Sequence, residues 1–345
     1  MANPAQQYLS IKTKRRFKYT SPYPHIVTSP YPHIVTSPHK SIAMRFFQSV
    51  LLTFAAIGIY AVFTNGSIYL NPAGERLNDE SPIAIAKQLP IPASITLFGE
   101  TIPLNDPDVR ERLDYELNLI VYSKQYQTID IMKSMHRFFP YMDQVLQQNG
   151  VPTDFKYLAV AESSLESTAT SPKGAKGVWQ FMEATAKEFN LEMNDEVDER
   201  SHTEKATEAA SKYLKNAFRK FNNWTLAAAS YNCGMTGLQN QIDAQQEWNY
   251  YNLFLNPETA RYIYRIIAYK QVLENPGLYG YKFSMPDRYN NYNLRETMVT
   301  SAGDLPTFAR TNGTNYKMLR TLNPWLRKNS LIGNGSKAYI IKLPN

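Results

Sequence analysis

The chain has 345 residues, 43% of them hydrophobic and 19% charged, so it is long and apolar enough to bury more than one core. Its net charge of +7 belongs to the N-terminal tail, because seven of the 37 lysines and arginines precede Phe46 and the other 30 equal the 30 aspartates and glutamates. A globular part without net positive charge excludes nucleic acid as an expected partner.

Residues 1–43 have the composition of a disordered repeat tail. The unit SPYPHIVT is written twice in residues 21–36 and begins a third time at Ser37. Proline at this density favours disorder over folding. Met44 follows directly and is a candidate start of translation, in which case the tail is an artefact of a misplaced start.

Residues 44–64 have the pattern of a signal peptide or membrane anchor. Arg45 precedes the apolar run Phe46–Phe63, which is marginal in length for a bilayer span and long for the apolar part of a signal peptide. Basic residues before such a run place the N-terminus in the cytoplasm, so the rest of the chain is expected across the membrane.

Residues 65–103 are rich in proline and lack helical periodicity, which indicates a linker or wrapping arm. A helix is then predicted from Asp106, an N-cap residue, and Pro107 at the first helical position. Ser201 and Glu204 have the spacing of a capping box at another helix start. Residues 104–290 are thus expected to form a mostly helical domain, with further helices over 129–148, the segment around Glu162, 201–221, 224–231 and 258–273.

Glu162 is the residue with the strongest indication of chemistry. Phe155, Leu158, Glu162 and Leu165 share one stripe of a helix, so a carboxylate stands among apolar side chains. If that stripe faces a cleft, desolvation raises the carboxyl pKa and keeps it protonated, as a general acid requires. The alternative is a glutamate at a helix end that faces water.

A glycine-rich turn follows this helix. Gly174 and Gly177 let backbone approach a ligand closely, and Ser171 and Gln180 then supply hydrogen bonds to a neutral polar ligand such as a sugar. The alternative is an ordinary β-turn with Trp179 in the core.

The last fifty residues, 294–345, change character. A strand, two short helices and a strand are predicted over Glu296–Thr300, the stretch to Arg310, Tyr316–Leu322 and Ala338–Leu343. A unit this small has no catalytic set of its own and is typical of a binding module.

Metal and thiol chemistry are not expected. His136 and His202, the histidines outside the tail, lack metal-ligand spacing. Cys233, the only cysteine, is expected as a small buried residue. A second carboxylate for glycoside cleavage has three candidates, which the sequence does not place opposite Glu162: Glu166, Glu183 and Glu188.

The chain resembles family 1 lytic transglycosylases, most closely the membrane-bound lytic murein transglycosylase D type. Four ordered blocks carry this resemblance: Ala161–Ser163, Ser171–Met182, Ala229–Gly234 and Glu258–Tyr262. The C-terminal unit resembles a LysM peptidoglycan-binding module through Thr300–Leu305 and Asn323–Pro324.

The resemblance implies an α+β fold: a mostly helical, lysozyme-like catalytic domain and a small βααβ LysM-like module. It makes Glu162 the sole catalytic acid and base. Substrate-binding positions transfer from the family to Ser163, Ser171, Gln180, Tyr231, Asn232, Glu258 and Tyr262, with Tyr231, Asn232, Glu258 and Tyr262 at positions that line the cleft or orient the catalytic carboxyl.

The implied reaction is cleavage of the MurNAc-(1,4)-GlcNAc bond of peptidoglycan without water, leaving 1,6-anhydroMurNAc ends, in cell wall remodelling or turnover. It needs no cofactor or metal. The implied partners are peptidoglycan glycan strands and, if residues 44–64 stay uncleaved, the membrane, with the enzyme in the cell envelope on the periplasmic side. Two alternatives remain: a goose-type lysozyme, which adds water, and a non-catalytic wall-binding protein.

Overall fold

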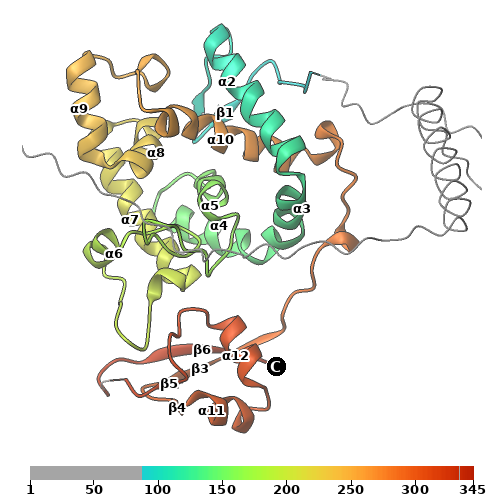
Figure 1. Cartoon of the computed structure of the whole chain (residues 1–345), viewed down its shortest axis with the longest axis vertical. Coiled ribbons are helices and arrows are strands. Elements are labelled where there is room, and N and C mark those ends of the chain that lie inside the picture. Colours follow the sequence, from blue (N-terminus) through green and yellow to red (C-terminus); the bar gives the residue numbers. More distant parts are fainter. Residues whose placement is uncertain (1–87, 334) are drawn as a thin grey trace, which may run out of the picture. The chain divides into compact units, whose positions relative to one another are not determined.

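The structure is a computed structural model that describes residues 88–333 and 335–345 (Figure 1). The predictions for residues 1–43 and 44–64, and for the N-terminal part of the expected linker, lie outside the described residues. Within the described ranges, no helix has both the length and the hydropathy needed to cross a membrane.

The region before the C-terminal module is mostly helical, as predicted. Its helices are α2 (Pro107–Asn118), α3 (Gln125–Ser134), α4 (Phe139–Gln148), α5 (Phe155–Ser163), α6 (Glu183–Glu188), α7 (Thr203–Phe221), α8 (Trp224–Cys233), α9 (Met235–Gln245) and α10 (Pro257–Glu274). Shorter helical turns are η1 (Leu119–Ser123), η2 (Met135–Arg137), η3 (Glu199–Ser201), η4 (Tyr250–Asn252), η5 (Pro276–Tyr279) and η6 (Met285–Asp287).

Helix α5 is the centre of this region. Figure 1 shows it enclosed by other helices, and Phe155 and Leu158 are completely buried. Helix α10 packs against α2, α5 and α8 and buries Ile263 and Ile267. A short central helix covered by long amphipathic ones gives the end of α5 a fixed position, which matters because Glu162 lies there.

Two helix predictions need correction. The helix expected over 129–148 is interrupted by η2 between α3 and α4, because Pro140 lacks the N–H that a continuous helix would need to bond the carbonyl four residues earlier. The capping box is also wrong, since α7 begins at Thr203 and its Ser201 belongs to η3. The cap at Asp106 is confirmed, with its side chain accepting from the N–H of Asp108 at 2.9 Å.

Part of the expected linker is folded into the helical region. Strands β1 (Thr96–Leu97) and β2 (Glu100–Thr101) form a hairpin, and the Phe98 ring stacks on Phe155 with centroids 3.9 Å apart. The Glu100 carboxylate accepts from the first backbone N–H groups of α8, at Trp224 (2.7 Å) and Thr225 (3.0 Å). An anion there satisfies donors that a helix start leaves open.

The C-terminal module has the predicted strand, helix, helix, strand order. Strand β3 (Leu294–Val299) pairs antiparallel with β6 (Tyr339–Pro344), Leu294 opposite Pro344. Helices α11 (Leu305–Thr311) and α12 (Tyr316–Leu322) lie between them in sequence. A second pair, β4 (Gly303–Asp304) with β5 (Ser330–Leu331), was not predicted, since two-residue strands leave no periodicity to read.

One segment of the helical region packs into the core of this module. We call residues 192–204 the acidic segment, because it holds six aspartates and glutamates and one arginine. Its Val197 is fully buried in a cluster with the module residues Leu305, Trp325 and Ile341. The backbone N–H of Asp198 donates to the Trp325 carbonyl at 2.8 Å.

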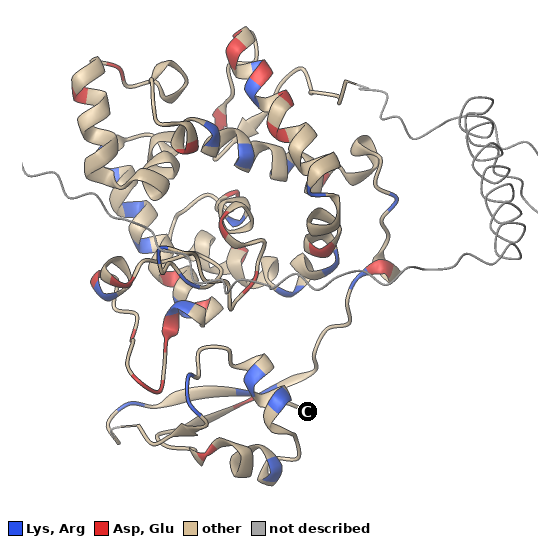
Figure 2. Ribbon diagram, in the orientation of Figure 1, with Lys and Arg blue, Asp and Glu red and all other residues tan. Residues whose placement is uncertain are grey.

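Opposite charges on the acidic segment and the C-terminal module add to this packing. The module carries eight lysines and arginines against two acidic residues, and Figure 2 shows the basic residues spread over its ribbon. Lys337 Nζ bonds Glu199 at 2.9 Å and also reaches Glu192, while Lys342 pairs with Glu204. The acidic segment and the module therefore form one packed, ion-paired interface.

Candidate active site

Glu162 lies in the last turn of α5, beside a cavity of about 330 Å³. The helix ends directly afterwards, because Ser164 and Leu165 have left-handed backbone with φ of 55° and 67°. Leu165 therefore leaves the predicted stripe but remains buried. The carboxyl group ends at the wall of a cavity, as the first of the two sequence interpretations requires.

The surroundings of Glu162 favour its protonated form. Burial raises the pKa of Glu162 to about 7, although a hydrogen bond from Tyr262 and the charge of Arg265 oppose the shift. The Tyr262 hydroxyl donates to Glu162 Oε1, and burial keeps the pKa of this tyrosine well above its usual value, so it stays a donor. A carboxyl with a pKa near neutrality serves as acid and then as base.

Two predicted binding residues, Ser171 and Gln180, line the same cavity as Glu162. Both also hold their own turn. Ser171 Oγ accepts from the N–H of Ala175 at 3.0 Å, and Gln180 Nε2 donates to the carbonyls of Ala169 (3.1 Å) and Gly177 (2.8 Å). The Gln180 carbonyl and the Ser171 hydroxyl proton are therefore the groups left to meet a ligand.

Ser163 and Tyr231 fix the wall of the cavity. Ser163 lines it, but its hydroxyl donates to the Val178 carbonyl at 2.8 Å. The Tyr231 hydroxyl donates to the Trp179 carbonyl at 2.8 Å. Together these bonds tie α5 and α8 to the residues between the turn and α6. Trp179 itself is fully buried, as the alternative interpretation of the turn expected.

The glycine-rich turn that contains Gly174 and Gly177 packs against residues 198–200 of the acidic segment. At Gly177, where φ is 81°, an added Cβ would lie 1.8 Å from the carbonyl oxygen of Arg200. Lys176 Nζ bonds Asp198 at 3.1 Å, and Arg200 Nη1 donates to the Gly174 carbonyl at 2.9 Å. Sequence reasoning missed this support, because a loop that lies across the turn carries no periodic signal.

Asn232 and Glu258 do not line the Glu162 cavity. They meet each other, with Asn232 Nδ2 3.4 Å from Glu258 Oε1, and the Thr259 hydroxyl donates to Asn232 Oδ1 at 2.7 Å. Glu258 is exposed, and its charge contributes to the raised pKa of Glu162.

No second carboxylate joins Glu162 among the residues that line its cavity. The three candidates from the sequence are all exposed: Glu166, Glu183 and Glu188. Over residues 88–333 and 335–345, no cluster of histidine, cysteine, aspartate and glutamate side chains is arranged to hold a metal ion.

Sequence reasoning missed several lining residues, among them Lys124 and Tyr269. Lys124 contributes an amine whose pKa is lowered by burial and by the nearby Arg265 charge, and Tyr269 a phenol whose pKa burial raises to about 12. Tyr269 follows Tyr262 by seven residues, two turns along α10, so the spacing offered a signal. Lys124 comes from the junction of η1 and α3, and nothing in its local sequence indicates the cavity.

Two protein families match parts of the chain. Residues 141–254 match the transglycosylase SLT domain, and residues 295–345 match the C-terminal LysM-like domain of soluble lytic transglycosylases.

Relatives are distant. Membrane-bound lytic murein transglycosylase D of Escherichia coli K12 is 26% identical over 249 residues, which are 71% of this chain and 54% of that protein. A putative tributyltin chloride resistance protein of Alteromonas sp. M-1 is 29% identical over 107 residues, 30% of this chain and 51% of that protein. The chain thus spans about half the length of these relatives.

Two solved structures, among others, show distant similarity to part of this chain. An inactive mutant of lytic transglycosylase Slt from Pseudomonas aeruginosa shares 17% identity over 44% of this chain and 26% of that chain, with a TM-score of 0.32. The 70 kDa soluble lytic transglycosylase of Escherichia coli shares 18% identity over 53% of this chain and 32% of that chain, with a TM-score of 0.37.

Proposed function

Because this chain carries a transglycosylase SLT domain followed by a LysM-like domain, we propose that it is a lytic transglycosylase that cleaves peptidoglycan. The observation that carries the proposal is Glu162, the single carboxylate on the wall of its cavity, with a pKa raised to about 7. A single carboxyl group that exchanges its proton near neutral pH suits a reaction in which the same group acts first as the acid and then as the base.

In the first step, protonated Glu162 donates its proton to the oxygen between MurNAc and GlcNAc as the C1–O bond of MurNAc breaks. Tyr262 bonds Oε1, so the proton to be given is on Oε2. The N-acetyl group of the sugar stabilises the electron-poor C1.

In the second step, ionised Glu162 takes the proton of the C6 hydroxyl of the same MurNAc, and that oxygen bonds C1 to close a 1,6-anhydro ring. Atoms balance without water, and the acid is regenerated. An attacking group already attached to the substrate has a proximity advantage over bulk water. No second carboxylate is needed, in keeping with the exposed positions of the other candidates.

Product analysis tests the proposal. Purified sacculi digested by the protein are expected to release fragments that end in 1,6-anhydroMurNAc, about 18 Da lighter than hydrolytic products because one water is missing. Reducing ends would assign the protein to the goose-type lysozymes. Binding of sacculi without any new ends would make it a non-catalytic wall protein.

The C-terminal module is proposed to hold peptidoglycan near the active site, because a linked binding unit raises the effective concentration of an insoluble substrate. The apolar run of residues 44–64 is proposed to export or anchor the enzyme, which places it in the cell envelope on the periplasmic side. Cosedimentation with sacculi, with and without residues 294–345, tests the first role. Fractionation of cells tests the second.

A further inference from the structure

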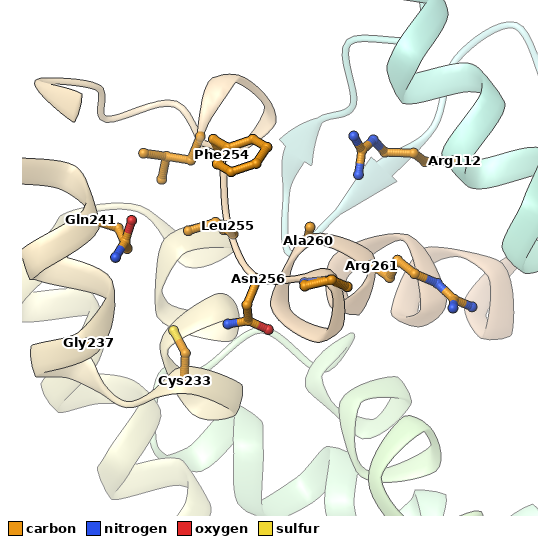
Figure 3. A pocket seen from close by; sticks show the side chains of 11 residues that line it. Arg112, Cys233, Gly237, Gln241, Phe254, Leu255, Asn256, Ala260 and Arg261 are labelled. Atoms are coloured by element: carbon orange, nitrogen blue, oxygen red, sulfur yellow. The ribbon is translucent and has the colours of Figure 1, made fainter. Parts of the chain in front are cut away.

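A second cavity has a volume of about 660 Å³ (Figure 3). It is formed by the end of α8, by α9, by the loop before α10, by the first turn of α10 and by α2, and it shares no lining residue with the Glu162 cavity. Neighbouring residues link the two sites: Asn232 meets Glu258, whose charge acts on Glu162, and the next residue, Cys233, lines the second cavity.

The walls of this cavity are apolar. Leu253, Leu255 and Pro257 line it together with Ala260. Phe254 is 87% exposed at the mouth, so a large ring stands open to a partner. Such walls suit small apolar groups, for example the methyl groups of alanine residues.

The rim adds positive charge. Arg112 and Arg261 line the cavity, and Figure 3 shows Arg112 and Phe254 on facing sides of the mouth. Arg112 pairs with Asp108 and Arg261 with Glu116, both through Nε and both at 2.6 Å. These pairings leave the terminal amino groups of each guanidinium for a second acceptor, and a planar pair of donors matches a carboxylate.

We propose that this cavity binds the carboxylate-bearing peptide attached to the glycan strand, while the sugar to be cut lies at Glu162. The inference rests on the proposed function, since it assumes a peptidoglycan substrate. The sugar end of the peptide enters past Asn232 and Glu258. Its alanine methyl groups pack on the leucine walls, and a free carboxylate meets Arg112 at the far side.

The chain supplies its own reporter for occupancy. Cys233, the only cysteine, is partly exposed in the cavity rather than buried as the sequence predicts, so its alkylation is measurable without catalysis. Burial raises the pKa of the Cys233 thiol, so the reaction with iodoacetamide is run at alkaline pH. The full chain carrying Glu162→Gln is used, because it does not consume the ligand.

Three probes are compared: a disaccharide–tetrapeptide with free carboxylates, the same compound with its carboxylates amidated, and a peptide-free GlcNAc tetramer. At a concentration near ten times its Kd, the free acid is expected to slow alkylation about tenfold. The amidated peptide and the tetramer are expected to leave the rate nearly unchanged.

Substitutions identify the recognising group. Arg112→Gln is expected to abolish protection, and Arg112→Lys to retain part of it. Arg112 suits this test because Asp108, its partner, is exposed, whereas Arg261 holds the buried Glu116. Arg110→Gln is the matched control, because Arg110 lies exposed on the same helix and does not line the cavity.

Equal protection by the peptide-free tetramer would overturn the inference and make the cavity a sugar site. Absence of protection by every probe would also overturn it, and if wild-type protein still forms anhydro ends, the proposed function survives that failure. Protection by the free acid alone, in a protein that cuts nothing, would support peptide binding and refute the proposed function.

Discussion

The proposed catalytic role of Glu162 and the stability of the fold make opposite demands on its pKa. Its pKa is near 4.5 in the unfolded chain and about 7 in the fold, so the folded state binds the proton more tightly and the free energy of unfolding falls as pH rises between these values. Glu162→Gln is expected to abolish cleavage yet to raise the free energy of unfolding at pH 8 by up to about 3 kcal/mol.

Activity on purified peptidoglycan and denaturant unfolding at pH 4 and pH 8 measure both effects. Glu166→Gln is the control, since Glu166 is exposed four residues away and its loss should change neither quantity. Near-normal cleavage by Glu162→Gln would remove the catalytic assignment.

Tyr262 is expected to set the pH range of the reaction. Its hydrogen bond lowers the pKa of Glu162, so Tyr262→Phe raises that pKa and moves the alkaline limb of kcat/KM from near pH 7 to higher pH. Loss of the positioning bond also lowers the maximal rate, by about tenfold if the bond contributes about 1.4 kcal/mol. A pH profile with an unmoved alkaline limb would show that Tyr262 does not act through Glu162.

At the scale of elements, the turn between α5 and α6 depends on its contact with residues 198–200. Gly177→Ala is expected to destabilise the fold by more than about 2 kcal/mol, because the new Cβ would meet the Arg200 carbonyl in backbone that already disfavours alanine. Gly174→Ala is the matched control: its φ is 84°, but the space beside it is open, so only about 1 kcal/mol of strain is expected. Similar losses in both variants, measured by thermal unfolding, would show that the contact contributes nothing.

Local signals predicted most of the helices and the apolar surroundings of Glu162, whereas long-range contacts determine the rest of the site. Asp106 as a cap and the stripe of Phe155, Leu158 and Glu162 are visible within one turn or two of chain. Lys124, by contrast, reaches the cavity of Glu162 through packing between distant segments, and the hairpin at Phe98 forms because Phe155 offers it a ring to stack on. Contacts between segments that lie far apart in the sequence leave no pattern among neighbouring residues.

At the scale of the molecule, the acidic segment and the C-terminal module are expected to stay bound to each other after the chain between them is cut. Burial opposes ionisation of Glu204, but His202 and Lys342 lower its pKa to about 2, so the pair stays charged at neutral pH. A protease site inserted between the exposed residues Asn290 and Asn291 allows the chain to be cut there. After cutting, the two parts are expected to coelute in gel filtration at low salt and to separate at about 1 M salt, where charges are screened.

Reversal of the two module charges checks which groups are responsible. Lys337→Glu with Lys342→Glu should release the cut module even at low salt. Lys317→Glu, an exposed change on the same module, should not. Release of the wild-type module at low salt would contradict the docked interface.

The docking of the C-terminal module on the acidic segment has a consequence for the lengths of the reaction products. If the module holds a glycan strand as proposed, its docked position presents that strand to Glu162 at one separation, and cuts are expected at a constant distance from the point of attachment. Early digests by the wild-type protein should then give a narrow distribution of fragment lengths. The double charge reversal should broaden that distribution and leave the chemical ends of the fragments unchanged, which chromatography of the early digest would reveal.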